Sequence, residues 1–264
     1  SLGRRLLART TRDVALTADG AAFLDDARDL VERADAALAR ARATGRPRLA
    51  ELRLGAIDTA AAGLVPRLLR DLRARAPDLD VCIAEDKTAR MLPKLLSGRL
   101  DLAFVRPPPS RDKRLKFRFM FHETAVVAAP TGHPLASRAR LSMKDLAGAT
   151  LVVPDRRTRP HSHDVTVKLF REAGLAPGPI LRADEKQTIL GMVAAGLGLA
   201  IVPRWASRMA LRGVRFVPIA RPRERAALDL LPLAAAWVRG SRDPARDAVL
   251  ALVEERLAAY ARGA

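Results

Sequence analysis

The sequence predicts an α/β fold in which short strands alternate with amphipathic helices. Apolar runs typical of buried strands occur at 52–57, 79–84 and 101–105. Helical spacing of apolar residues follows at 64–76 and 88–97. At 264 residues and 49% hydrophobic content, the chain is long enough to bury one large core or two small ones. Strands and helices alternating at this length indicate a parallel, doubly wound sheet.

Composition narrows the classes of partner and compartment. The formal net charge of +18 points towards nucleic acid or other anionic partners, although basic residues spread along a chain are weaker evidence than a basic patch. No apolar run approaches the roughly 20 residues that span a bilayer, and the basic first residues do not resemble a signal peptide. The single cysteine, Cys82, excludes an internal disulfide and fits a reducing cytoplasm. We expect Cys82 to be a small core side chain in a buried strand.

The first 16 residues predict a two-stranded hairpin with a basic tip. Two short apolar runs flank the polar turn 9–13, and four arginines in the segment face one acid, Asp13. The arginines are Arg4, Arg5, Arg9 and Arg12. A hairpin of this size is too small to be stable alone. The alternative is a frayed, solvated basic terminus.

A long helix is predicted over 17–46. Thr17 can cap its start, and Asp19 in its first turn is favourable to the helix dipole. Apolar residues then recur at alternating spacings of three and four, which is a heptad seam, at Leu24, Ala27, Val31, Ala34, Leu38 and Ala41. Since so narrow a stripe must be buried, we expect it to dimerise with the same helix of a second chain. The alternative is that it packs on its own domain.

Polar residues follow each of the first three predicted strands. Asp58 and Thr59 follow the first, Thr88 can cap the helix after the second, and Arg106 follows the third. Because ligands of such sheets lie at the carboxyl ends of the strands, these residues should converge. Backbone N–H groups at helix starts attract anions, although an ordinary cap would only satisfy the backbone. Asp58 should repel an anion, and Pro93 suggests a helix start later than Thr88.

The second half of the chain continues the alternation. Further strands are predicted at 123–130, 150–153, 198–203, 214–219 and 228–238. Further helices are predicted at 142–146, 165–173, 185–195 and 244–261. A basic loop, 155–163, contains His161 and His163.

Neither enzymatic nor metal chemistry is indicated. Two histidines in a basic loop, with no cysteine or acidic cluster nearby, are a weak set of metal ligands. Gly191, Gly196 and Gly198 stand in the wrong context for a phosphate-binding loop, and no serine stands in a G-x-S-x-G elbow. We therefore expect no cofactor, no bound metal and no catalytic residue.

The stretch LGRRLLARTTRDVALTADGAAFLDDARDL resembles the end of the winged helix-turn-helix of LysR-type transcriptional regulators, followed by their linker helix. The resemblance implies that 1–16 is the remnant of a wing and 17–46 the dimerisation helix. The wing residues that would contact DNA are Arg4, Arg9, Thr10 and Arg12. Because Ser1 is not a methionine, we expect a fragment whose two main DNA-binding helices precede it.

A second resemblance covers nearly all of 52–260. The stretches LRLGAI, LVPRLLRDLRARAPDLDV, LLSGRLDLAFVR, VVAAPTGHPLA, SMKDL and MVAAGLGLAIVP are similar to the effector-binding domain of the same family. The resemblance implies two Rossmann-like subdomains, as in periplasmic solute-binding proteins, with an effector in the cleft between them. Effector subdomain I would comprise 51–122 and 228–264, and effector subdomain II would comprise 123–227.

Within the family, EDKTARMLPKLLSGRLDLAFVR and DEKQTILGMVAAGLGLAIVP look most like the muconate- and benzoate-responsive branch of aromatic catabolism. This resemblance implies a small organic anion as the effector. The residues implied to line its site are Asp58, Thr59, Thr88, Arg106, Pro160, His161 and Ser162. A carboxylate there can accept hydrogen bonds from threonine hydroxyls and helix-terminal N–H groups, with Arg106 supplying charge.

The function implied is that of a cytoplasmic, DNA-binding transcription regulator. The implied partners are DNA, a small organic acid, further copies of the chain in a homodimer and homotetramer, and RNA polymerase, with no membrane. One alternative is a solute-binding protein of an uptake system, which shares the cleft and which an export signal would reveal. A second alternative is an enzyme that uses the cleft, which turnover of muconate-like acids would reveal.

Overall fold

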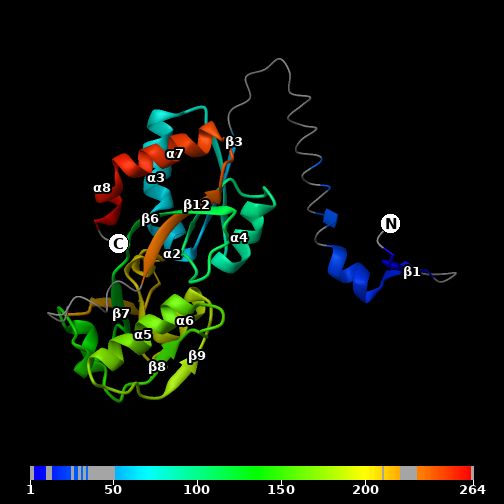
Figure 1. Cartoon of the computed structure of the whole chain (residues 1–264). Helices are drawn as coiled ribbons and strands as arrows, with labels where there is room; N and C mark the ends of the chain where they lie inside the picture. The colour runs from blue at the N-terminus through cyan, green and yellow to red at the C-terminus, as the bar shows by residue number, and fades with distance from the viewer. Residues whose placement is uncertain are drawn as a thin grey trace.

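The computed structural model describes residues 3–9, 14–24, 27, 28, 31, 34, 51–209, 211–220 and 231–262. It confirms the predicted α/β class, with strands and helices in two subdomains (Figure 1). We define subdomain I as the described residues of 51–122 and 231–262, and subdomain II as 123–220. No helix in the described part of the chain is long and apolar enough to cross a membrane.

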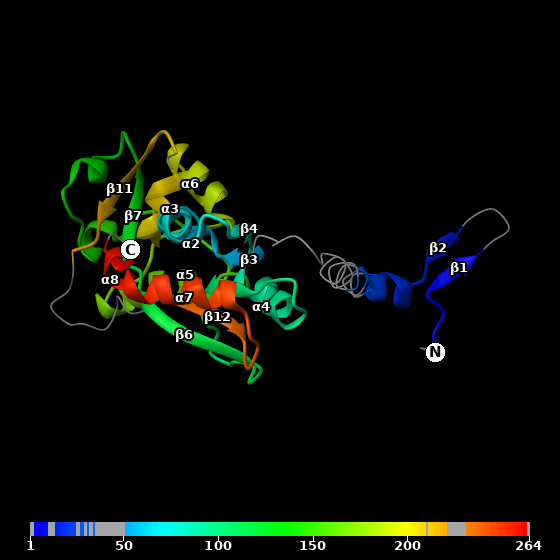
Figure 2. The ribbon, with the colours of Figure 1, turned by 90° about the horizontal axis from the view of Figure 1, so that it is seen from above.

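The N-terminal segment forms the two predicted strands. Strand β1 (Leu7–Arg9) pairs antiparallel with β2 (Val14–Leu16), and Figure 2 shows them side by side. The backbone N–H of Gly20 donates to Oγ1 of Thr17 at 3.0 Å. Thr17 therefore caps the helix that begins at residue 18, as predicted.

The predicted DNA-contacting residues are only partly described. Nη1 of Arg4 lies 3.2 Å from Oδ1 of Asp19, and both side chains are exposed. Arg9 ends β1 opposite Val14. Two further predicted residues, Thr10 and Arg12, lie outside the described residues, as do Leu38 and Ala41 of the predicted heptad seam.

Subdomain I contains a five-stranded sheet of order β4-β3-β5-β12-β6. The strands are β3 (Glu51–Ala56), β4 (Asp80–Glu85), β5 (Leu102–Val105), β6 (Leu115–His122) and β12 (Pro232–Val238). β3 lies parallel to β4 and β5, as predicted, but β12 runs antiparallel to β5 and β6. The sheet is therefore mixed. β6 was not predicted, although the alternation of apolar and basic residues from Leu115 to Phe119 is a strand pattern.

Helices pack against this sheet and against one another. They are α2 (Asp58–Gly63), α3 (Val65–Arg75), α4 (Thr88–Leu96), α7 (Pro244–Glu255) and α8 (Leu257–Ala261). The helix predicted over 244–261 is divided at Arg256, and the short helix α2 precedes the helix predicted over 64–76. α3 packs on α7, and α4 packs on β5 and β12. One hydrophobic core results, with Leu54, Leu68 and Phe104 fully buried in it.

Subdomain II is built around β7 (Ala125–Pro130), which pairs antiparallel with β10 (Ala200–Pro203) and β11 (Val214–Pro218). A parallel pair, β8 (Leu151–Val153) and β9 (Ile180–Arg182), joins it through a bridge from Leu151 to Leu199. β9 was not predicted. The helices are α5 (Pro160–Glu172) and α6 (Lys186–Ala194), with 3-10 helices η1 (Pro134–Ser137), η2 (Met143–Leu146) and η3 (Arg204–Met209).

Two local predictions were wrong. α5 begins at Pro160 rather than at 165, because proline has a fixed φ and lacks the N–H that the first helical position leaves unpaired. His161 and Ser162 therefore lie in its first turn and not in a loop. Cys82 is exposed rather than buried, because β4 is an edge strand and most of its residues are open.

Candidate functional site

The carboxyl ends of the strands in subdomain I face the starts of α5 and α6 in subdomain II. Among the described residues, three polar contacts join these strand ends to the starts of α5 and α6. Nη1 of Arg159 lies 2.9 Å from Oδ2 of Asp58, and Nζ of Lys87 lies 2.7 Å from Oε1 of Glu185. Nε2 of His161 lies 3.2 Å from the backbone oxygen of Pro107. The cleft is therefore bridged by ion pairs.

Arg106 forms an internal ion pair with Glu123. Its Nη2 donates to Oε2 of Glu123 at 2.6 Å, and its Nη1 donates to the backbone oxygen of Pro232 at 3.2 Å. Glu123 is 0% exposed, and its other oxygen accepts from the backbone N–H of Trp205 at 2.9 Å. A charge-assisted pair of this length, removed from water, is strong and geometrically fixed. The charge of Arg106 is thus neutralised within the chain.

The same ion pair joins the two segments that connect the subdomains. Glu123 lies between β6 and β7, and its backbone N–H donates to the backbone oxygen of Leu231, just before β12. Arg106 contacts both segments, through Glu123 and through Pro232. This cluster therefore sits at the hinge between the subdomains.

Thr59 and Thr88 both lie against Arg106, as the convergence of strand ends predicted. Oγ1 of Thr59 donates to Oε2 of Glu123 at 3.2 Å and accepts from Nη2 of Arg106 at 3.4 Å. Oγ1 of Thr88 accepts from the backbone N–H of Arg106 at 3.2 Å. α4 begins at Thr88 even though Pro93 lies inside it, so the later start that we expected is wrong. Lys87, not Thr88, takes the N-cap position.

Asp58 is buried and faces cations from both subdomains. Its Oδ1 accepts from the backbone N–H of Thr59 at 2.7 Å, while its Oδ2 accepts from Arg159. Burial alone would raise the pKa of Asp58. Lys186, Arg159, the N–H of Thr59 and Arg106 together outweigh burial and lower the pKa below its ordinary value. Asp58 is therefore an ionised carboxylate, held in the cleft by positive charge.

The predicted residues of subdomain II lie at the start of α5. Pro160 is exposed, whereas Ser162 is buried. His161 contacts the backbone oxygen of Pro107 across the cleft. The three residues share one helical turn, and they lie next to Arg159, the N-cap residue of α5.

Sequence reasoning missed four charged residues of the cleft: Glu123, Arg159, Glu185 and Lys186. Arg159 binds Asp58, Glu185 and the backbone oxygen of Asp184. Lys186, the first residue of α6, is only 3% exposed. A charged run before an apolar helix normally marks a solvated helix start, so the sequence offers no signal that Lys186 is buried. Only the packing of α6 against the other elements places it inside.

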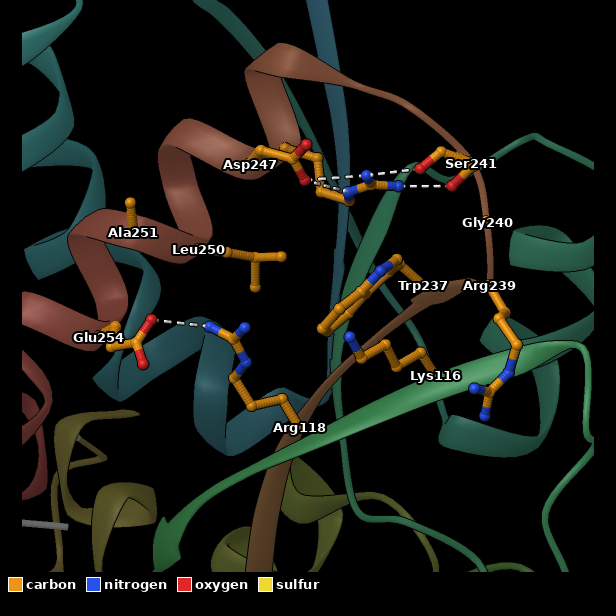
Figure 3. A pocket seen from close by; sticks show the side chains of 11 residues that line it. Lys116, Arg118, Trp237, Arg239, Gly240, Ser241, Asp247, Leu250, Ala251 and Glu254 are labelled. Carbon is orange, nitrogen blue, oxygen red and sulfur yellow. Dashed lines mark hydrogen bonds and ion pairs between the residues drawn. The ribbon is translucent and has the colours of Figure 1, made fainter.

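A separate hollow of about 450 Å³ lies on subdomain I, between α7 and the strands β6 and β12 (Figure 3). Trp237 forms its floor, with the cationic groups of Lys116, Arg118 and Arg246 within 6 Å of the indole ring. Arg118 pairs with Glu254, and Arg246 pairs with Asp247. None of the predicted site residues lines this hollow.

Histidine, cysteine and acidic side chains do not gather in the described part of the chain in any group of three or more that could hold a metal ion. Cations, hydroxyl groups and backbone N–H groups, which do meet between the subdomains, are groups that can hydrogen-bond to an anion.

Comparison with known proteins identifies relatives of both sequence and fold. The family model described as the LysR substrate binding domain matches residues 45–258. The HTH-type transcriptional regulator TtuA of Agrobacterium vitis is 48% identical over 264 residues, covering 100% of this chain and 86% of TtuA. The uncharacterised HTH-type regulator YnfL of Escherichia coli K12 is 34% identical over 220 residues, covering 83% of this chain and 74% of YnfL.

Two solved structures share the fold. Full-length CbnR complexed with its target DNA superposes with a TM-score of 0.79 at 25% identity, covering 96% of this chain and 85% of CbnR. The BenM effector binding domain with its effector benzoate gives a TM-score of 0.67 at 25% identity, covering 79% of this chain and 92% of that domain.

Proposed function

The chain belongs to the LysR family of transcriptional regulators, and we propose that a small organic anion, bound in the cleft between its two subdomains, controls it. Members of this family bind DNA and small-molecule effectors and are not enzymes. The observation that carries the proposal is the meeting of buried and half-buried cations from both subdomains at the cleft. Arg106 belongs to subdomain I, and Arg159 and Lys186 belong to subdomain II.

The proposed effector site comprises Asp58, Thr59, Thr88, Arg106, Pro160, His161 and Ser162. Arg106 would act with its two threonines as one unit, since both hydroxyls already contact it. His161 and Ser162 would approach the effector from the first turn of α5. BenM, a relative in fold, is described with benzoate as its effector, which supports a carboxylate here and an intermediate of aromatic degradation as one source.

Effector binding would alter transcription by changing the angle between the subdomains. The Arg106–Glu123 pair lies at the hinge, so an anion near Arg106 would weaken its attachment to the connecting segments. A ligand shifts such an equilibrium only if it binds one arrangement better than the other. The muconate- and benzoate-responsive branch is the proposed place of this chain within the family.

The N-terminal part would serve assembly and DNA binding. We assign 1–16 to the wing, where Arg4, Arg9, Thr10 and Arg12 would contact DNA, and 17–46 to a dimerisation helix. Val31 of the seam is 60% exposed, which supports burial by a second copy. A homotetramer acting with RNA polymerase in the cytoplasm completes the proposal. The fit to CbnR in complex with its target DNA supports the DNA-binding part of it.

DNA selection followed by effector titration tests the proposal. The full chain would first be used to select duplexes from a random library, and fluorescence anisotropy would then follow the selected duplex as benzoate or cis,cis-muconate is added. We expect at least one such acid to change the affinity for the duplex. Arg106→Lys should weaken acid binding in calorimetric titration, because it keeps a charge for Glu123 but loses the planar guanidinium. Unchanged acid affinity would remove Arg106 from the site.

A further inference from the structure

Lys186 is the cation of the cleft that lacks a partner in the described part of the chain. Lys87, Arg106 and Arg159 each lie within 2.9 Å of a carboxylate oxygen. For Nζ of Lys186, the described residues provide neither a hydrogen bond nor an ion pair within 4 Å. The residue is only 3% exposed, although Nζ itself is not completely enclosed. A buried ammonium is costly unless a counter-charge meets it.

Asp58 and Arg159 are the charged residues that most affect the pKa of Lys186. Burial lowers the pKa of Lys186, Asp58 opposes that effect, and Arg159 and Arg106 add to it. The carboxylate of Asp58 is already bound to Arg159 and to the N–H of Thr59. It therefore compensates Lys186 from a distance and without a hydrogen bond.

We propose that Lys186 is the residue that anchors the effector's carboxylate, and that Asp58 limits this part of the cleft to one carboxylate. The assignment rests on the proposed function and names the ligand chemistry of the same cleft. An incoming carboxylate supplies the counter-charge that Nζ lacks, through charge-assisted hydrogen bonds. Lys186 opens α6, whose first N–H groups favour the same charge.

The restriction to one carboxylate follows from the acidic side chains of the chain itself that lie near Lys186. A second carboxylate beside Lys186 would lie next to Asp58, whose two oxygens are held in place by Thr59 and Arg159. Glu85 stands at the end of the neighbouring strand β4, and burial together with Asp58 raises its pKa. Like charges this close disfavour a further anion.

The test measures binding of simple carboxylates and their neutral amides to the full chain. Benzoate, propionate and acetate would be titrated against benzamide, propionamide and acetamide by calorimetry at fixed ionic strength. On the wild-type chain, at least one carboxylate should bind more tightly than its amide. Lys186→Met should weaken that carboxylate at least about tenfold and leave the amide unchanged.

Lys116→Met is the matched control. Lys116 is also a lysine without a carboxylate partner in the described part of the chain, but it lies over Trp237 in the outer hollow (Figure 3). This variant should bind the carboxylate like the wild-type chain. Equal loss in both variants, or no loss in Lys186→Met, overturns the anchor. Failure of every carboxylate to exceed its amide on the wild-type chain overturns it as well.

Asp58→Asn should change carboxylate affinity in the opposite direction from Lys186→Met. A folding defect would not increase the affinity. Removing the internal carboxylate should tighten binding of the same acid several-fold and admit the dianion succinate, which the wild-type chain should bind more weakly than propionate. No gain for either acid overturns the role of Asp58. If Lys186→Met loses carboxylate binding but carboxylates do not change the affinity of the wild-type chain for DNA, only the regulatory proposal is refuted. An effect on DNA affinity that survives Lys186→Met refutes the anchor alone.

Discussion

Oδ2 of Asp58 accepts a hydrogen bond from Nη1 of Arg159 at 2.9 Å, although the two residues are 101 positions apart and belong to different subdomains. From the sequence, we expect Asp58 to repel an anion. In the structure it is itself the anion that neutralises a cation of the opposite wall. Asp58 thus forms a contact between the two subdomains. A carboxylate ligand would compete with Asp58 for the same cations, and mutation of Asp58 can measure this competition.

A double-mutant cycle should reveal coupling between Asp58 and Arg159. Each side chain is largely buried, so loss of either leaves its partner poorly compensated. We expect Asp58→Asn and Arg159→Met to be non-additive by at least about 1 kcal/mol in the free energy of unfolding from urea titrations. Strict additivity would show that the pair does not hold the subdomains together.

Glu123→Gln should be strongly destabilising. It leaves the guanidinium of Arg106 buried without a counter-charge, and the loss should reach about 3 kcal/mol in urea unfolding. Glu255→Gln is the matched control, because its ion pair with Arg75 is 53% exposed on both sides and should contribute less than about 1 kcal/mol. Equal effects at the two sites would contradict the hinge cluster as a structural element.

Gly63→Ala should destabilise the contact between α2 and η3. A Cβ at Gly63 would overlap the indole ring of Trp205, which is fully buried, so one of the two elements must move. We expect a loss of about 1–3 kcal/mol and a lower melting temperature. Gly191→Ala serves as control, because nothing lies within 4 Å of its added Cβ inside α6. It should stabilise the chain by about 0.5–1 kcal/mol.

Lys186→Met should stabilise the chain even though it weakens carboxylate binding. Burial lowers the pKa of Lys186, which means that the folded state disfavours its charged form. Replacing this ammonium by an apolar group of similar length should raise the free energy of unfolding by about 1 kcal/mol. Urea unfolding at neutral pH without added carboxylate is the measurement. A less stable variant would show that Asp58 compensates the charge fully.

Acid should weaken the chain partly through Asp58. Burial raises the pKa of Asp58, but Lys186, Arg159 and the other nearby donors and cations together bring it below its ordinary value of 3.8 in the folded state. A depressed carboxyl pKa gives a stabilising contribution that is complete above 3.8 and is lost as the pH falls through the folded value. As the pH falls from 3.8 to the folded value, the unfolding free energy of the wild-type chain should therefore fall more steeply than that of Asp58→Asn. Parallel pH profiles would contradict the cause given for the shift.

Much of the architecture could be predicted because it depends on local patterns. The alternation of apolar strands and amphipathic helices predicted the class, and the strand ends predicted that Thr59, Thr88 and Arg106 would meet. Predictions failed where the exposure of a side chain depends on its surroundings in the folded chain. Cys82 has apolar neighbours in its strand, yet it is exposed, because β4 is an edge strand of the sheet that the described residues form.

The sequence by itself determined the family, the α/β class and the convergence of three polar residues at one edge of a sheet. Tertiary structure decided which charges meet. Glu123, Arg159 and Lys186 lie far from Asp58 and Arg106 along the chain, and their pairing depends on how two subdomains close on one another. Electrostatic energy depends on distance and on exclusion of water, and neither quantity can be read from the order of residues. For that reason Asp58 changed from an obstacle to an internal ligand, and Lys186 emerged as the unpaired cation of the described cleft.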